Sequence, residues 1–423
     1  MLRHLILLPL VLLLACQTQP KEVRQAQNMH YELELSVDIT RQQLAGELTI
    51  ILPSQQSDSI LILSHGRLNI DSVFGQDVIQ YWQEDRQLFI QFTEVPSSQP
   101  IHIHYHGMPK RGVSFGHQSV HTHYFTNEWM PCQFQPGQRA TFELNIGLPD
   151  SLQVIGVGNF QGETSLPDQQ KVSSWRLDKA MPAYTYGFSA SRFNHAQTKT
   201  DSLTLQACSA AYTEEELAEI FTETKQMMAF FTEKSGLSYP FNSYTEVLAT
   251  DNVSQEMSAF SILRESYGKQ VLADSSQVNL SAHELAHQWW GNRITCETWQ
   301  HFWLNEGMAV FMSSAFIEHR FGREQYLADI QLYRDAWKKV PNHSLVYDDW
   351  SKATAKDRVI VYYKGACFLH ELRGELGEDI FWRGIKEYSQ TFADQSVHSK
   401  DFQAMMEKAA KRSLAEVFDA WVW

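Results

Sequence analysis

The amino-acid sequence predicts two domains, an antiparallel all-β domain over residues 30–205 and a mainly helical domain over residues 206–423. The chain has 423 residues, which is long for one compact core and comfortable for two. In the first half, apolar and polar residues alternate, as they do in strands with one buried face. From about residue 210 onwards, the apolar residues follow the helical repeat instead.

A targeting segment precedes the first predicted strand. Residues 1–15 place Arg3 before an apolar run that is too short to span a bilayer, which is typical of a signal peptide. The run ends at Cys16 in a sequence that resembles the lipobox of bacterial lipoproteins, whose cysteine carries the lipid. Because Gln17 follows the cysteine, the resemblance implies an outer-membrane anchor facing the periplasm, with residues 16–29 as a polar tether. The alternative is an ordinary secretory signal with an incidental cysteine.

The β domain is predicted from strands in which every second residue is apolar. The first strand covers residues 31–39, and the polar residues between its apolar ones mark a solvent-facing side. Similar runs, separated by Gly, Pro, Asp and Ser, occur at residues 48–52, 60–63, 88–92, 101–105 and 142–148. His102, His104 and His106 alternate on one strand face. A second metal site is one interpretation of these histidines, and a plain polar surface is the favoured one.

The helical domain is predicted to begin with a capping box, in which Thr213 and Glu216 open a helix that runs to Lys234. Gly236 follows as a helix-ending residue. Further helical patterns, with two more towards the C-terminus, occupy residues 276–291, 304–320, 324–338 and 358–376. One short strand is predicted at residues 245–250.

Composition and charge exclude several kinds of partner. Asp and Glu outnumber Lys and Arg by 49 to 35, giving a net charge of −14, and no basic stripe offsets it, so nucleic acid is not an expected partner. No apolar run reaches about 18 residues, so no membrane-spanning helix is expected. The cysteines beyond Cys16 fit neither a metal site nor a dense disulfide framework, so buried free thiols are expected, although an oxidising compartment would permit a bridge. They are Cys132, Cys208, Cys296 and Cys367.

The strongest chemical feature is the pair His283 and His287, which are four residues apart. Glu284 directly follows the first histidine. On a helix, residues i and i+4 lie on the same face, so both imidazoles can bind one ion. Glu284 lies beside that face, where a carboxylate can accept a proton from a metal-bound water. Two histidines do not hold a catalytic zinc, so a third ligand is needed. Glu306, early in the next helical segment, is the candidate.

The same residues carry a family resemblance. Residues 283–291 (His-Glu-Leu-Ala-His-Gln-Trp-Trp-Gly) and 304–307 (Leu-Asn-Glu-Gly) resemble the metal motif of the zinc aminopeptidases related to aminopeptidase N and leukotriene hydrolase. Further segments similar to that family are residues 129–132, 140–144, 239–241 and 362–366. The resemblance covers residues 30–423 and implies a saddle-like β domain, a thermolysin-like catalytic domain and one Zn²⁺ ion. It also implies a short form, because family members usually continue into a helical C-terminal domain.

The resemblance implies a role for each residue of the site. His283, His287 and Glu306 would hold the zinc ion, with one position left for water. Glu284 would be the general base, and Tyr362 would stabilise the oxyanion of the tetrahedral intermediate. The alternative for Tyr362 is a core aromatic residue on the apolar face of its helix.

An aminopeptidase also needs an anchor for the ammonium group of its substrate. The family uses the Glu of a Gly-x-Met-Glu-Asn strand, and residues 253–257 (Val-Ser-Gln-Glu-Met) keep only Glu256 of that pattern. A carboxylate suits the ammonium group, and a surface Glu in a loop is the alternative. The family resemblance implies a second anchor in the β domain, for which Glu128, His121 and Gln118 are all candidates.

The sequence therefore predicts a zinc-dependent aminopeptidase that removes N-terminal residues from peptide substrates. A zinc endopeptidase with the same site is the first alternative. The second is a non-catalytic lipoprotein that binds a peptide or an envelope partner, which the altered strand around Glu256 favours. The oligomeric state and the preferred N-terminal residue remain open at this point.

Overall fold

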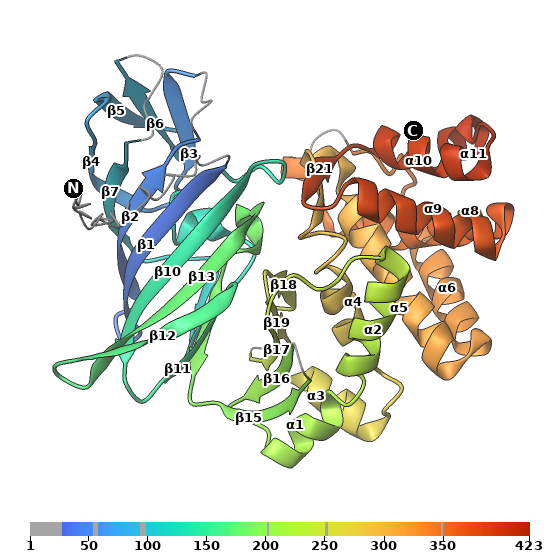
Figure 1. Cartoon of the computed structure of the whole chain (residues 1–423), viewed down its shortest axis with the longest axis horizontal. Helices are drawn as coiled ribbons and strands as arrows, with labels where there is room; N and C mark the ends of the chain where they lie inside the picture. Colours follow the sequence, from blue (N-terminus) through green and yellow to red (C-terminus); the bar gives the residue numbers. More distant parts are fainter. Residues whose placement is uncertain (1–27, 54–57, 94–98, 201–202, 250–252, 348–349) are drawn as a thin grey trace, which may run out of the picture.

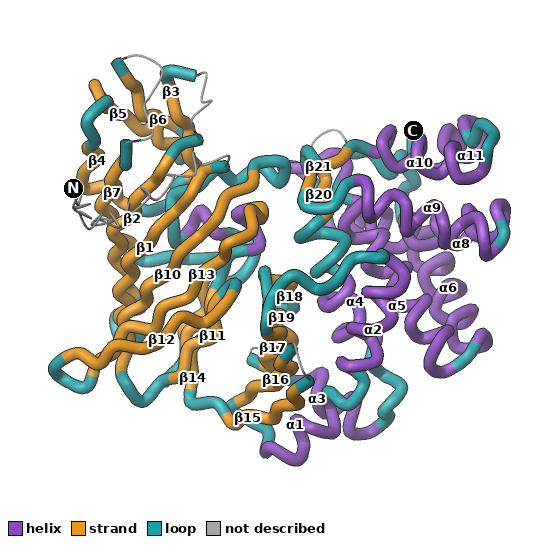
Figure 2. Tube along the Cα trace, viewed as in Figure 1, coloured by secondary structure: helices purple, strands orange, loops and turns teal. Residues whose placement is uncertain are grey.

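A computed structural model describes residues 28–53, 58–93, 99–200, 203–249, 253–347 and 350–423 (Figure 1). The predicted signal peptide and nearly all of the predicted tether, including Cys16, lie outside the described residues. A strand-rich N-terminal half and a helix-rich C-terminal half lie side by side, as predicted (Figure 2). Among the described residues, no helix has the length and apolar character needed to cross a bilayer.

The largest sheet of the N-terminal half has seven strands. Their order is β12 (Asn159–Leu166), β13 (Gln170–Pro182), β10 (Arg139–Pro149), β1 (Met29–Asp38), β2 (Gln43–Ile51), β7 (Ile101–Gly107) and β4 (Asn69–Phe74). The prediction that this domain is antiparallel throughout is wrong at one place, because β1 and β10 pair in parallel. These two strands are far apart in the sequence, so no hairpin forces them to run in opposite directions.

Two smaller sheets complete the β domain. One has the order β3 (Ile60–Ser64), β6 (Gln87–Phe92) and β5 (Val78–Glu84), and the other has the order β11 (Gln153–Gly156), β14 (Phe188–Ser191), β9 (Val120–Thr122) and β8 (Val113–Phe115). Alternate residues of the long strands are buried, as the period-two pattern predicts. Cys132, Cys208, Cys296 and Cys367 are buried as free thiols.

A fourth sheet, with five strands, lies between the two halves of the molecule. Its order is β15 (Asn194–Lys199), β16 (Thr204–Ser209), β17 (Ser243–Leu248), β19 (Phe260–Leu263) and β18 (Gln255–Met257). Val247 and Ile262 belong to the core of the β domain, whereas Leu248 and Leu263 belong to the core of the helices. The predicted boundary after residue 205 falls inside β16, because the apolar alternation continues through strands that pair with the second domain.

The helices make up most of the second half of the molecule. They are α1 (Glu214–Ile220), α2 (Thr224–Ser235), α3 (Ser266–Ala273), α4 (Asn279–Ala286), α5 (Trp303–Phe321), α6 (Arg323–Trp337), α7 (Ala355–Val359), α8 (Gly365–Leu376), α9 (Glu378–Thr391), α10 (Ser399–Ala410) and α11 (Ala415–Trp421). The capping box at Thr213 is present as predicted. The helix predicted up to Lys234 is broken into α1 and α2, where the Thr222 hydroxyl bonds back to the Ala218 carbonyl.

Candidate metal centre

His283, His287 and Glu306 converge on one point between α4 and α5. The two imidazole Nε2 atoms are 3.1 Å apart, and Glu306 Oε2 is 3.4 Å from each of them. A tetrahedral zinc ion with bonds of about 2.1 Å places neighbouring ligand atoms about 3.4 Å apart. The three atoms therefore form a triangle of the size that one face of a zinc site requires.

The chemical state of the three side chains also fits a metal. Glu306 Oε2 is buried and has no hydrogen-bond partner among the described residues. Burial alone would raise the pKa of Glu306, but the two imidazoles lower it below its usual range, which keeps the carboxylate ionised. His287 Nδ1 donates a hydrogen bond of 3.0 Å to the Trp290 carbonyl, which can only accept. This bond leaves the Nε2 lone pair of His287 directed at the centre.

Gly291 of the same motif leaves room for the His287 ring because it has no side chain. It has a φ of +145°, and a Cβ atom at this position would lie 2.7 Å from His287 Nδ1. The helix predicted over residues 276–291 ends earlier, at Ala286. His287 nevertheless keeps helical backbone angles, and its amide bonds to the His283 carbonyl, so the predicted spacing of the two imidazoles survives.

Two further carboxylates lie beside the three candidate ligands. Ligand atoms of Glu256, Glu284 and His287 all lie within 4.8 Å of one another. Burial raises the pKa of Glu256 to about 7, and burial raises that of Glu284 well above its usual range. With Glu306, they make a buried group of three carboxylates, which favours the binding of cations.

Tyr362 approaches the site because two helices pack closely. It lies in a π-helical turn, Ile360–Lys364, and its ring stacks on His283 with centroids 6.0 Å apart. Gly307 follows Glu306 on α5, and Gly365 begins α8. A Cβ atom on Gly307 would lie 3.0 Å from the Gly365 Cα atom. These two glycines therefore permit the contact that brings Tyr362 towards Glu306.

The side-chain amide of Gln288, just after α4, connects this helix to the strand that carries Glu256. Gln288 Nε2 donates to the Met257 carbonyl at 2.9 Å, and its Oε1 accepts from the Ala259 amide at 3.2 Å. These bonds fix the turn between β18 and β19 against α4. These bonds hold Glu256 near the centre although its neighbours differ from the Gly-x-Met-Glu-Asn pattern of the family.

Comparison with known protein families accounts for both halves of the chain. The Peptidase M1 N-terminal domain matches residues 27–185, and the Peptidase family M1 domain matches residues 220–421. The chain belongs to the peptidase M1 family. This result agrees with the resemblance seen in the metal motif.

Several curated relatives of this M1 protein are aminopeptidases. It is 26% identical over 310 residues to glutamyl aminopeptidase of Sus scrofa, an alignment that covers 69% of this chain and 33% of that protein. It is 29% identical over 321 residues to leucine aminopeptidase 2 of Emericella nidulans, covering 69% and 50%, and 23% identical over 437 residues to aminopeptidase N of Lactococcus lactis, covering 92% and 50%. The chain therefore spans about a third to a half of the length of these relatives.

Solved structures match the M1 chain over nearly its whole length. An M1 zinc metallopeptidase from Deinococcus radiodurans has a TM-score of 0.77 at 19% identity, covering 94% of this chain and 95% of that one. A mutant of that protein bound to a Tyr-Ser-Ala substrate has a TM-score of 0.80 at 19% identity, covering 94% of each chain. At this identity the likeness establishes the two-domain fold alone.

Sequence reasoning missed one residue that the M1 fold brings from the β domain to the site. The Tyr124 hydroxyl donates to the Ser254 carbonyl at 2.6 Å, and the Tyr124 amide bonds to the Gln255 side chain. Burial raises the pKa of Tyr124, and the carboxylates of Glu284 and Glu256 add to the effect. No motif marked this residue, because the contact joins segments 130 positions apart.

The three candidates for a second amine anchor in the M1 β domain have other surroundings. Glu128 is buried and pairs with Arg111 at 2.7 Å. His121 is buried and bonds to Ser189 of β14 at 2.6 Å, and burial lowers its pKa to about 4. Gln118 is exposed. None of the three belongs to the groups of metal-type ligands found among the described residues.

Proposed function

We propose that this M1 protein is a zinc-dependent aminopeptidase that hydrolyses N-terminal residues from peptides. The observation that carries the proposal is the convergence of His283, His287 and Glu306 next to two more buried carboxylates. The names of the curated relatives support the same activity. Because the chain spans only part of those relatives, its own activity has to be measured.

One zinc ion held by the three ligands would supply a Lewis acid that activates water and polarises the peptide carbonyl. Glu284 accepts a proton from the attacking water and passes it to the leaving amine, and its raised pKa suits a group that must hold that proton in between. The Tyr362 hydroxyl donates to the oxyanion that develops on the carbonyl oxygen. The raised pKa of Tyr362 keeps this hydroxyl protonated.

Glu256 gives the proposal its exopeptidase character. Its buried carboxylate lies beside Glu284 and His287. An ammonium group placed there offsets the mutual repulsion of the carboxylates, whereas a blocked amine cannot. Tyr124 borders the same strand and is proposed as a contact for the first residues of the substrate.

Hydrolysis of a panel of aminoacyl-arylamides, with and without a chelator, tests the activity. We expect hydrolysis that the chelator abolishes and that zinc restores. A folded, zinc-loaded protein without such hydrolysis would support the non-catalytic alternative. The altered residues around Glu256 are the one observation that favours that alternative.

The endopeptidase alternative shares the metal centre and differs in the use of Glu256. An N-acetylated peptide and its free counterpart separate the two activities, because the acetyl group removes the positive charge. Faster hydrolysis of the free peptide is expected. Equal rates would assign the chain to the endopeptidases.

We further propose that the chain is a lipoprotein of the bacterial cell envelope, anchored through Cys16 in the outer membrane and facing the periplasm. The apolar run and the lipobox-like ending in residues 1–16 support this proposal. Labelling with a radioactive fatty acid, followed by membrane fractionation, is the test. Labelled Cys16 is expected, and a Cys16→Ser variant that stays labelled would contradict the proposal.

A further inference from the structure

A buried carboxylate in the second domain joins two helices to the central sheet. Glu246 lies on β17, and its side chain is buried. The Thr224 hydroxyl donates to Glu246 Oε2 at 2.5 Å, and the Ser281 hydroxyl donates to Glu246 Oε1. Among the described residues, no Lys, Arg or His forms an ion pair with Glu246. The two hydroxyl groups are therefore its main fixed partners.

The two donors stand at the starts of two different helices. Thr224 is the first residue of α2, and Ser281 lies in the first turn of α4. The N-terminal end of a helix carries a partial positive charge, so each helix presents a favourable end to the carboxylate. Ser281 is two residues before His283, whereas α2 supplies no ligand to the centre. One carboxylate thus links the sheet to the metal helix and to a helix outside the site.

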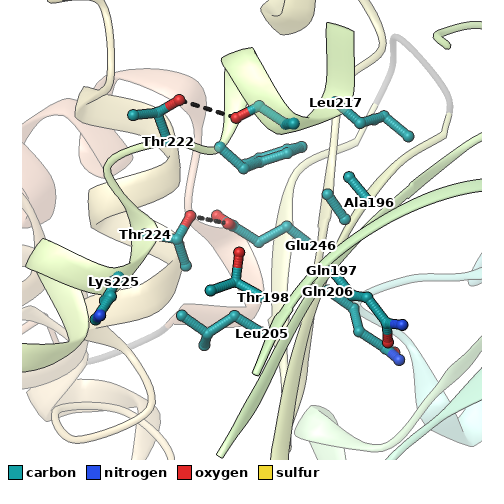
Figure 3. A pocket seen from close by; sticks show the side chains of 13 residues that line it. Ala196, Gln197, Thr198, Leu205, Gln206, Leu217, Thr222, Thr224, Lys225 and Glu246 are labelled. Carbon is teal, nitrogen blue, oxygen red and sulfur yellow. Dashed lines mark hydrogen bonds between the residues drawn. The ribbon is translucent and has the colours of Figure 1, made fainter. Parts of the chain in front are cut away.

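A cavity borders Glu246 on its remaining side. It has a volume of about 110 Å³ and lies between α1, α2 and the strands β15 and β16 (Figure 3). Thr224 and Glu246 point towards each other at the wall of the cavity, whereas the nitrogen of Lys225 points away (Figure 3). On the side that borders the cavity, the carboxylate is not held by closely packed side chains. Each hydroxyl group bonds to a different oxygen of the carboxylate, so the loss of one bond leaves the other in place.

We propose that Glu246 is a positioning residue for the catalytic centre, which fixes the first turn of α4 against β17 through Ser281 and thereby sets the place of His283 and Glu284. It touches neither substrate nor metal ligand. Small displacements of a catalytic helix carry large costs, because the ligand triangle and the general base move together. The inference rests on the proposed roles of His283 and Glu284.

Two single-hydroxyl variants form a matched pair that tests the proposal. Ser281→Ala removes the bond to the metal helix, and Thr224→Val removes the bond to α2, so each deletes one donor to the same carboxylate. For each variant, kcat and KM are measured on an aminoacyl-arylamide, zinc affinity is measured by competition with a chelator dye, and Tm is measured on the metal-free protein.

We expect Ser281→Ala to lower kcat by about 10-fold and to weaken zinc binding by a similar factor, with KM little changed. Thr224→Val should lower Tm to a comparable extent and leave kcat and zinc affinity close to the wild-type values. Equal effects of the two variants on kcat and zinc affinity would overturn the proposal, because a purely structural role makes no distinction between the helices.

Two substitutions at Glu246 separate the effect of side-chain length from the effect of side-chain charge. Glu246→Gln keeps the length of the side chain, and rotating hydroxyl groups can bond to its amide, so near-wild-type kcat is expected. Glu246→Asp keeps the charge and loses the reach, so it should resemble Ser281→Ala. The reverse order of the two activities would overturn the positioning role. An inactive wild-type protein would instead refute the proposed function, while the zinc affinities of the hydroxyl variants would still test the positioning.

Discussion

Two regions of the molecule carry histidines at regular spacing, the helix α4 and the strand β7, and they have different surroundings. At the C-terminal end of α4, His283 and the capping residue His287 face a buried carboxylate, and three candidate ligand atoms lie within 3.4 Å of one another. On β7, the histidines do not converge on one point, and two of them, His102 and His104, contact the Phe74 ring. His102 bonds to Thr49, His104 packs edge-on against Phe74, and His106 pairs with Asp71.

The comparison teaches that spacing alone does not make a metal site. Both elements place their histidines on one face, as their helical or strand repeats require. Of the two elements, only α4 has a buried carboxylate from a distant segment beside its histidines, and the Oε2 atom of this residue, Glu306, has no hydrogen-bond partner in the part of the chain that the structure describes. Only there does a backbone carbonyl, that of Trp290, orient an imidazole. Among the described residues, the groups able to hold a metal ion do not include the histidines of β7. Burial and the neighbours supplied by the fold make the difference.

The largest expected effect is the loss of zinc and activity when Glu306 is removed, and the matching variant on β7 is its control. Glu306→Ala should abolish tight zinc binding and peptidase activity, because it removes one of three ligands from a buried centre. His104→Ala should leave both unchanged. Metal analysis after dialysis and an arylamide assay measure the two effects. Zinc loss in the His104 variant would show that β7 also binds the ion.

The next effect separates metal binding from catalysis on α4. Glu284→Gln should retain zinc and lower kcat by at least about 10³-fold, since the amide cannot accept the proton of the attacking water. Retained zinc in the same preparation excludes loss of the centre as the cause. A rate close to that of the wild type would contradict the mechanism.

A somewhat smaller effect is expected at Tyr362. Tyr362→Phe keeps the ring that stacks on His283 and removes the hydroxyl, so kcat should fall by about 10²- to 10³-fold with zinc affinity unchanged. Tyr363→Phe, on the neighbouring residue that stacks on Tyr333, is the matched control and should retain activity. Equal loss in both variants would assign Tyr362 to the core.

Glu256→Gln tests the anchor for the substrate ammonium group. The variant should raise KM for free peptides by about 100-fold, because a buried carboxylate that pairs with a cation is lost. Its weak activity on N-acetylated peptides should stay the same. A uniform loss on both kinds of peptide would mean that Glu256 supports the site in some other way.

The smallest expected effect is on stability, and it concerns the buried charge behind α4. Burial raises the pKa of Glu246 to about 7, above the value of the unfolded chain. The folded state then binds the proton more tightly, so this contribution to stability is full at low pH and is lost as the pH rises through 7. Tyr244 and Tyr267 also face this carboxylate, and their pKa values are raised, so neither titrates in this range.

Between pH 5.5 and 7, the wild type should lose about 2 kcal/mol of unfolding free energy relative to Glu246→Gln. Urea titrations at several pH values measure the difference. Asp71→Asn, which removes the exposed partner of His106 on β7, is the control, and its stability should stay parallel to that of the wild type. Parallel curves for Glu246→Gln would refute the pH effect.

Much of the fold was predictable because it depends on local periodicity. Alternating residues marked the long strands, and the capping box at Thr213 marked the start of the second domain. The parallel pairing of β1 with β10 was not predictable, because it joins segments more than 100 residues apart. The predicted domain boundary, after residue 205, falls inside β16. The strands β15 and β16 pair with each other, and β16 also pairs with β17 of the second domain.

The sequence by itself determined which three side chains are the candidate metal ligands, because the spacing of His283 and His287 on a helix puts both imidazoles on one face and their motif points to Glu306. It also determined the residue types that the proposed chemistry requires, including Glu284. Only the tertiary structure decided which side chains meet: the contact of Gly307 with Gly365, the approach of Tyr124, and the link from Glu246 to α4. These contacts depend on packing between distant segments, which no local pattern encodes.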